Sequence, residues 1–151
     1  MRTAKQTGSS LVEVMVALFV LAIGLLGILA MQSKSMQYNQ SAHVYSQAVY
    51  LANDIAERIR LNPTASYIVG VDDEVTASTD CGNNACPSDA LAQWDVQEWK
   101  AAVDKALPSG KAGIAAVAGV AAVKIEVSFD DSRSEGSGTE TRKAYALVVG
   151  L

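Results

Sequence analysis

A single acidic side chain, Glu13, lies near the start of an otherwise apolar stretch. Residues 14–31 are all apolar or glycine, and a helix of that length crosses the roughly 30 Å hydrocarbon core of a bilayer. An ionised carboxylate in hydrocarbon costs about 2.5–3.5 kcal/mol even on lenient insertion scales. Glu13 therefore indicates either a carboxylate that stays near the membrane interface or a charge that has a dedicated partner.

A short basic leader precedes the apolar stretch. Its only charged residues are Arg2 and Lys5, and because the basic flank of a span stays in the cytoplasm, the rest of the chain is expected outside. A cleaved secretory signal has a shorter apolar core, and here a helical pattern continues beyond the core. A plain signal anchor explains the length of the stretch but leaves Glu13 unexplained.

The segment GSSLVE, from Gly8 to Glu13, resembles the processing site of type IV prepilins and of type II secretion pseudopilins. That family has a basic leader ending in Gly and a Glu at the fifth position after the cleaved bond. The resemblance implies cleavage between Gly8 and Ser9 by prepilin peptidase, and methylation of the new amine of Ser9. The family most often has Phe at the position of Ser9.

The same resemblance divides the chain into three segments and places it in the cell. Residues 1–8 are expected to be the leader, residues 9–31 the transmembrane and filament-core helix, and residues 32–151 a periplasmic globular domain. The chain is expected to cross the inner membrane once before assembly and then to be part of a pilus on the cell surface.

Glu13 then gains a partner. The new α-amine of Ser9 is positive, so the amine of one subunit could pair with the Glu13 carboxylate of a neighbour. Each charge is costly alone in a dry environment, and pairing offsets much of that cost. We expect Glu13 to set the axial register between subunits; a carboxylate that merely lies near the interface is the alternative.

The two cysteines, Cys81 and Cys86, lie close together in CGNNACP. In an exported, oxidising environment a short-loop disulfide is expected. A metal site would need further ligands nearby, and the only histidine, His43, is far away in the sequence on an expected helix. The cysteine spacing also differs from that of a CxxC redox motif.

The remaining composition argues against an enzyme and against a nucleic-acid binder. Without the leader the chain holds ten basic and sixteen acidic residues, a net charge of −6, and no basic patch is evident that would collect phosphates. No Ser–His–Asp set, phosphate-binding glycine loop or metal-ligand spacing is found, so no catalytic residue and no cofactor are expected. The acidic cluster at Asp72, Asp73 and Glu74 is expected in a solvated loop rather than in a calcium site.

The expected fold is α+β, with one long helix over residues 11–61 that ends before Pro63. Its first half spans the membrane and its second half is amphipathic. The helix carries an acid–base pair, Asp54 with Arg58, on its polar face. Its apolar stripe is expected at Tyr38, Ala42, Tyr45, Val49, Ala52, Ala56 and Ile59.

The C-terminal part is expected to add a second helix and a small antiparallel sheet. The helix is expected to be capped by Asp89 and to use Leu91, Trp94, Trp99, Val103 and Leu107 as its apolar positions. Strands are expected at residues 113–118, 121–129 and 142–151, with Val123, Ile125, Val127 and Phe129 on one face of the second and Tyr145, Leu147, Val149 and Leu151 together on the third. A Gly/Ser-rich hairpin loop is expected before the third strand. The meander needs a cover, which the first helix supplies.

The order of LANDIAERIR, NP, EWK, LPSG and VKIEVSFDD resembles the branch of minor pilins known as type IV pilus modification proteins, PilV. One difference is Phe129, near which that branch is expected to have Trp. The resemblance implies a minor pilin that helps to initiate pilus assembly, at or near the tip. It implies as partners prepilin peptidase, the other minor pilins, the major pilin and, where the filament carries one, a tip adhesin. The alternative is a minor pseudopilin of a type II secretion system.

Overall fold

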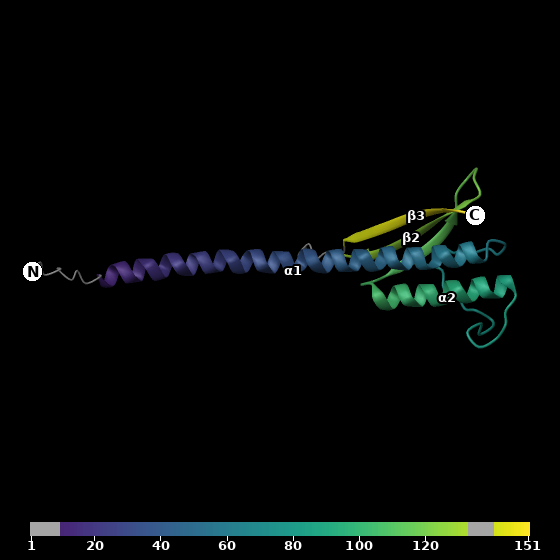
Figure 1. The fold of residues 1–151 in the computed structure, drawn as a ribbon, viewed down its shortest axis with the longest axis horizontal. Helices are drawn as coiled ribbons and strands as arrows, with labels where there is room; N and C mark the ends of the chain where they lie inside the picture. The colour runs from purple at the N-terminus through teal and green to yellow at the C-terminus, as the bar shows by residue number, and fades with distance from the viewer. Residues whose placement is uncertain (1–9, 133–140) are drawn as a thin grey trace, which may run out of the picture. The chain divides into compact units, whose positions relative to one another are not determined.

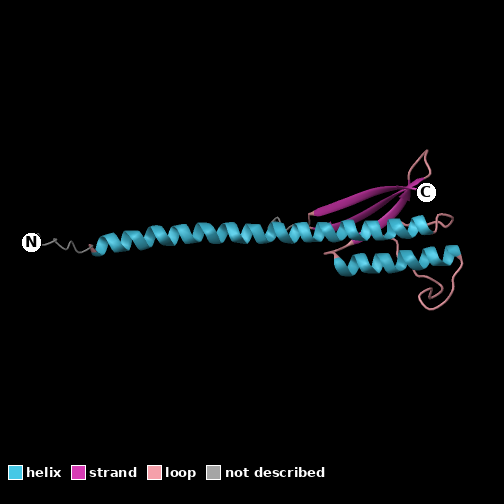
Figure 2. Ribbon diagram, viewed as in Figure 1, coloured by secondary structure: helices cyan, strands magenta, loops and turns pink. Residues whose placement is uncertain are grey.

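The computed structural model describes residues 10–132 and 141–151, and shows helices and a sheet in the expected order (Figures 1 and 2). The elements are α1 Leu11–Leu61, α2 Ser88–Ala106, β1 Lys111–Ala116, β2 Ala122–Asp130 and β3 Arg142–Gly150. The strands form an antiparallel sheet in the order β1-β2-β3. The predicted α+β class, with a long N-terminal helix packed on a small antiparallel sheet, is confirmed. Most of the hairpin loop expected before β3 lies outside the described residues.

The chain divides into two units, Met1–Tyr38 and Asn39–Leu151, and α1 contributes to both. In the second unit α1 buries Ala48, Ala52, Ile55, Ala56 and Ile59. The expected stripe is confirmed at Ala52, Ala56 and Ile59 and is wrong at Tyr38, Ala42 and Tyr45, which are exposed. Tyr38 belongs to the other unit, and Ala42 and Tyr45 precede Ala48, the first buried residue of α1. The Tyr45 ring still contacts Phe129 and Tyr145, and the remaining predicted position, Val49, is half-buried.

Helix α2 begins one residue earlier than expected and is not capped by a side chain. Pro87 occupies the N-cap position in an extended conformation, and its carbonyl accepts the N–H of Leu91 at 3.0 Å. The prediction of Asp89 as the cap is wrong, because Asp89 lies inside the first turn, where its charge instead complements the helix dipole. The buried face consists of Ala92, Asp95, Val96, Trp99 and Val103. Leu91 and Trp94, expected on that face, are only half-buried.

The central strand β2 follows the alternation of its sequence except at Ser128, which is buried and contacts the Lys111 carbonyl and Arg142. Val123, Ile125, Val127 and Phe129 of β2 are all buried, as expected. Strand β1 ends two residues earlier than expected because a tight turn follows it, in which Gly119 adopts a φ of +81°. On β3, Val149 is buried but Leu151, expected to share its face, is 57% exposed beyond the end of the strand.

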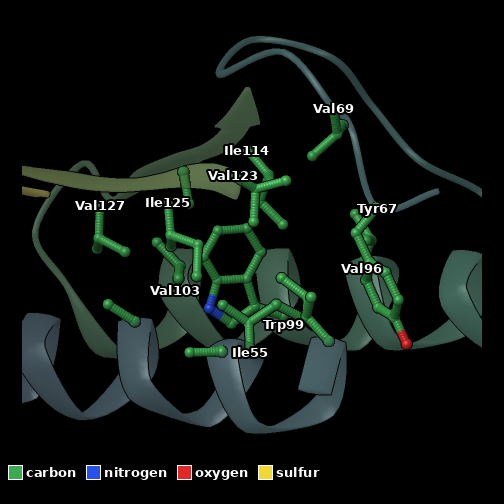
Figure 3. Close-up of a cluster of buried hydrophobic side chains, with 14 of the residues drawn as sticks. Ile55, Tyr67, Val69, Val96, Trp99, Val103, Ile114, Val123, Ile125 and Val127 are labelled. Atoms are coloured by element: carbon green, nitrogen blue, oxygen red, sulfur yellow. The ribbon is translucent and has the colours of Figure 1, made fainter. Parts of the chain in front are cut away.

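One hydrophobic core lies between the sheet and the two helices, with Trp99 of α2 near its centre (Figure 3). The indole lies between Ile55 of α1 and the strand residues Val123 and Ile125. It is 1% exposed, and its Nε1 donates to the Leu51 carbonyl of α1 at 2.8 Å. Trp99 therefore joins all three layers, and its predicted packing role is confirmed.

Candidate functional site

The first turns of α1 carry the motif that the sequence singled out. None of its most apolar stretch is buried, and α1 is the one helix in the described residues that is long and apolar enough to cross a membrane. Glu13 lies in the first turn, with an exposed side chain and its backbone N–H donating to the Ser10 carbonyl at 2.9 Å. Gly8 and Ser9 lie outside the described residues, so the cleavage, methylation and pairing predictions stay predictions.

Glu13 is electrostatically isolated within the described part of the chain. It is the only charged residue of α1 before Lys34, and no ion pair joins it to any residue in 10–132 or 141–151. The N-terminal end of a helix carries partial positive charge, which favours a carboxylate there. An apolar helix that retains one such acid is suited to bind a cationic group supplied from elsewhere.

In the second unit, α1 is attached to the sheet at its Asn39 end by a polar contact and an aromatic cluster. Ser41 donates to the buried Asp131 carboxylate at 2.7 Å, and Lys143 pairs with the same carboxylate. Tyr45 packs edge-on against Phe129 and Tyr145, with ring centroids 6.5 and 5.9 Å apart. Sequence reasoning missed this attachment, because nothing near Asp131 in the sequence identifies Ser41 as its partner.

At the other end, α1 is joined to α2 by a partly buried polar cluster. Arg58 donates to the Asp95 carboxylate at 3.0 Å, and the Tyr67 hydroxyl donates to its other oxygen at 3.0 Å. Burial alone would lower the pKa of Arg58, but Asp95 and Asp54 together raise it. Burial, with help from Asp95, raises the pKa of Tyr67 to about 12. The expected Asp54–Arg58 pair is present at 3.0 Å, whereas the role of Asp95 was missed.

The acidic cluster Asp72, Asp73 and Glu74 is exposed, as expected, but its loop is organised by a lysine. Lys100 of α2 donates to the backbone carbonyls of Gly70, Val71 and Asp73 at 2.8, 3.2 and 2.6 Å. Burial lowers the pKa of Lys100, and the ion pair with Lys111 lowers the pKa of Asp72. The carbonyl oxygens that converge in this loop thus bind an ammonium group of the protein itself.

Cys81 and Cys86 form the predicted disulfide, with their Cα atoms 5.6 Å apart. Asp80 organises the start of this loop, since its side chain accepts from the Gly82 N–H and from the Asn83 amide. His43 is exposed on α1, where the sequence placed it without a role. The described residues contain no cluster of three or more metal-ligating side chains.

Two protein-family models match the N-terminal part of the chain. Residues 3–29 match the prokaryotic N-terminal methylation motif, and residues 30–97 match the family described as Tt1218-like, type IV pilin Tt1218. No curated protein and no solved structure matches. The two matches together cover more than half of the 151 residues, and they implicate prepilin peptidase in processing. The chain belongs to the type IV pilin family, whose members are structural proteins rather than enzymes, and is a prepilin with an N-terminal hydrophobic helix and a methylation motif.

Proposed function

We propose that this chain is a minor pilin of a type IV pilus, that it takes part in the initiation of assembly, and that it is located at or near the pilus tip. The observation that carries the proposal is Glu13, an exposed acid in the first turn of an apolar helix, with no ion-pair partner in the described residues. Such a charge is stable in a membrane or a filament core only when another group neutralises it.

In the proposed mechanism, prepilin peptidase removes residues 1–8 by cleaving the bond between Gly8 and Ser9. The amine of Ser9 is then methylated, stays cationic, and pairs with the Glu13 carboxylate of a neighbouring subunit. Residues 9–31 provide the membrane-spanning segment before assembly and the filament-core segment afterwards. Because the pair forms only at one axial offset between subunits, Glu13 fixes the register.

Residues 32–151 form the proposed periplasmic domain, which becomes part of the surface filament. Its partners are the other minor pilins, the major pilin and, where present, a tip adhesin. A nucleic acid is not among the proposed partners, because the domain has a net negative charge and would repel phosphate groups. The finer assignment to the PilV branch rests on the order of helix, tryptophan-containing helix and VKIEVSFDD strand, which α1, α2 and β2 reproduce.

The experiment that tests the proposal measures surface pilin sheared from a strain that lacks this chain, beside the same strain complemented with the wild-type chain. The proposal predicts a large loss of surface pilin that complementation restores, together with loss of twitching. Unchanged surface pilin with impaired export of secreted proteins would instead identify a minor pseudopilin of a type II secretion system.

A further inference from the structure

The two edges of the sheet differ. The outer edge of β1 is covered, because Val69 exchanges two backbone hydrogen bonds with Ile114, at 2.9 and 2.8 Å. Val71 lies directly over the same strand, so a Cβ added at Gly113 would come within 2.8 Å of its Cγ2. In the part of the chain that the structure describes, β3 has no strand on its other side. A long uncovered edge of this kind is a ready template for pairing with another chain.

The hydrogen bonds at the two ends of β3 show which backbone groups are available. The Asp131 N–H donates to the Thr141 carbonyl, and the Leu151 N–H donates to the Ala121 carbonyl, both at 2.9 Å. Because backbone groups alternate in direction along an antiparallel strand, odd-numbered residues of β3 bond to β2. The N–H and C=O groups of Ala144, Ala146 and Val148 therefore point to the open edge.

Beyond Arg142 and Lys143 at its start, β3 carries no side chain that blocks pairing. Residues 144–150 of β3, AYALVVG, contain neither proline nor a charge, although charged residues and prolines are the usual protection of exposed edges. Ala144, Ala146 and Val148 are exposed on the outer face, and their small size leaves room for larger side chains on a neighbouring strand.

The core is also incomplete beside this edge. Tyr145 and Leu147 face the core but are only half-buried, whereas Ile125 and Val127 of β2 are fully buried. On α1, an apolar hollow of about 480 Å³ is lined by Tyr45, Ser46, Val49, Tyr50 and Asn53. All residues that line the hollow belong to α1, and the ring contact between Tyr45 and Tyr145 places the hollow beside β3. We call the edge and the hollow together the β3–α1 groove.

We propose that the β3–α1 groove binds an extended strand contributed by another pilus subunit, which adds to the sheet beside β3. The strand's backbone would bond to Ala144, Ala146 and Val148. Every second side chain would be apolar and would enter the hollow at Tyr45 and Val49, as in other cases of strand addition. This inference rests on the proposed function, since it takes the partner from the same filament.

The geometry favours a different subunit over a second copy of this chain. Within the Asn39–Leu151 unit, β3 begins near Ser41, through Asp131, and ends near Ile59, so it runs in the direction of α1. Two β3 edges can pair about a two-fold axis only when they are antiparallel, which would set the two α1 segments in opposite directions. Subunits along one filament repeat in one direction. Among the strands that the structure describes, a second copy in the same direction could offer only its β1 edge, which Val69 covers.

The test is site-specific photocrosslinking of the full-length chain in piliated cells. The variant Tyr50→p-benzoylphenylalanine places the photoreactive group in the hollow, and the adduct is identified by mass spectrometry. Ala146→Pro removes one outward N–H and leaves the bonds to β2 intact, because proline is tolerated on an edge whose N–H faces solvent. Ala146→Val, which retains the N–H, is the matched control, and Val148→Lys is a second block that retains every backbone donor.

We expect an adduct with another pilin-like subunit, reduced about tenfold by Ala146→Pro and by Val148→Lys but retained in Ala146→Val. Unchanged thermal unfolding of the variants would show that the body is intact. An adduct unaffected by both blocks, an adduct with a second copy of this chain, or the absence of a protein adduct would overturn the inference. The proposed function is tested separately, by whether pili form without this chain. If pili depend on the chain, the proposed function stands even when the crosslinking overturns the inference. If pili form without the chain, the proposed function is refuted.

Discussion

Asp95 and Asp54 bind the same arginine from two environments, which allows a sharp prediction of stability. The side chain of Asp95 is 12% exposed and accepts from both Arg58 and the Tyr67 hydroxyl; that of Asp54 is 48% exposed and is paired with Arg58 at i,i+4. Asp95→Ala removes a charge-assisted bond and leaves the buried Tyr67 hydroxyl with only the more distant Arg58 carbonyl, at 3.5 Å, as acceptor. We expect this loss to cost about 2–4 kcal/mol. Asp54→Ala should cost about 0.3–0.5 kcal/mol, the usual value of an exposed helical pair.

The measurement is denaturant unfolding of the full-length chain in detergent micelles, followed by the fluorescence of Trp94 and Trp99, both of which lie in α2. The free energies are obtained from the shift in midpoint at an unchanged slope. The free energies of unfolding of the two variants could instead differ by less than about 0.5 kcal/mol. Burial would then not govern the strength of these pairs, and the cluster would not hold α2 to α1 as the structure indicates.

Three further predictions concern the stability of the Asn39–Leu151 unit. Gly113→Ala should destabilise it by about 1–3 kcal/mol, because the new Cβ meets the segment that crosses β1, whereas Gly150→Ala meets nothing within 4 Å and should be nearly neutral in the same unfolding assay. Because burial raises the pKa of Tyr67 from 10.0 to about 12, the folded chain keeps a proton that the unfolded chain loses, so stability should fall as pH rises from 10 towards 12; Tyr67→Phe should lack this component. Replacing Cys81 and Cys86 together by Ser should cost at most about 2 kcal/mol, since the loop is short, and the unfolding transition should stay cooperative.

Periodicity and local chemistry predicted much of the fold. The limits of α1 follow from an uninterrupted helical pattern that ends before Pro63. The alternation of β2 predicted the buried Val123, Ile125, Val127 and Phe129 but not Ser128, which is buried although it lies on the opposite face. The pairing of Cys81 with Cys86 needed only proximity in the sequence and an oxidising compartment. Such features depend on neighbours within a few residues, which a sequence displays directly.

Long-range polar contacts could not be predicted in the same way. Asp95 looks like an ordinary exposed acid in a helical sequence, and only the packing of α2 against α1 brings it to Arg58. The partnership of Ser41 with Asp131 spans 90 residues. The asymmetry of the sheet edges also depends on the loop that brings Val69 to β1. The N-terminal site was accessible from sequence because its motif, from Gly8 to Glu13, is contiguous.

The central claim, that Glu13 neutralises the N-terminal amine of a neighbouring subunit, is tested most directly by comparing membrane insertion with incorporation into pili. Glu13→Gln preserves the size of the side chain and removes its charge, and Gln32→Ala serves as a control just beyond the apolar stretch. We predict unchanged leader cleavage and membrane levels for both variants. Recovery of the Glu13→Gln chain in sheared pili should fall at least about tenfold. The variant leaves the Ser9 amine of the neighbouring subunit without its carboxylate, and an unpaired charge in a dry core costs about 3–5 kcal/mol. Incorporation of Glu13→Gln at the wild-type level would contradict the account.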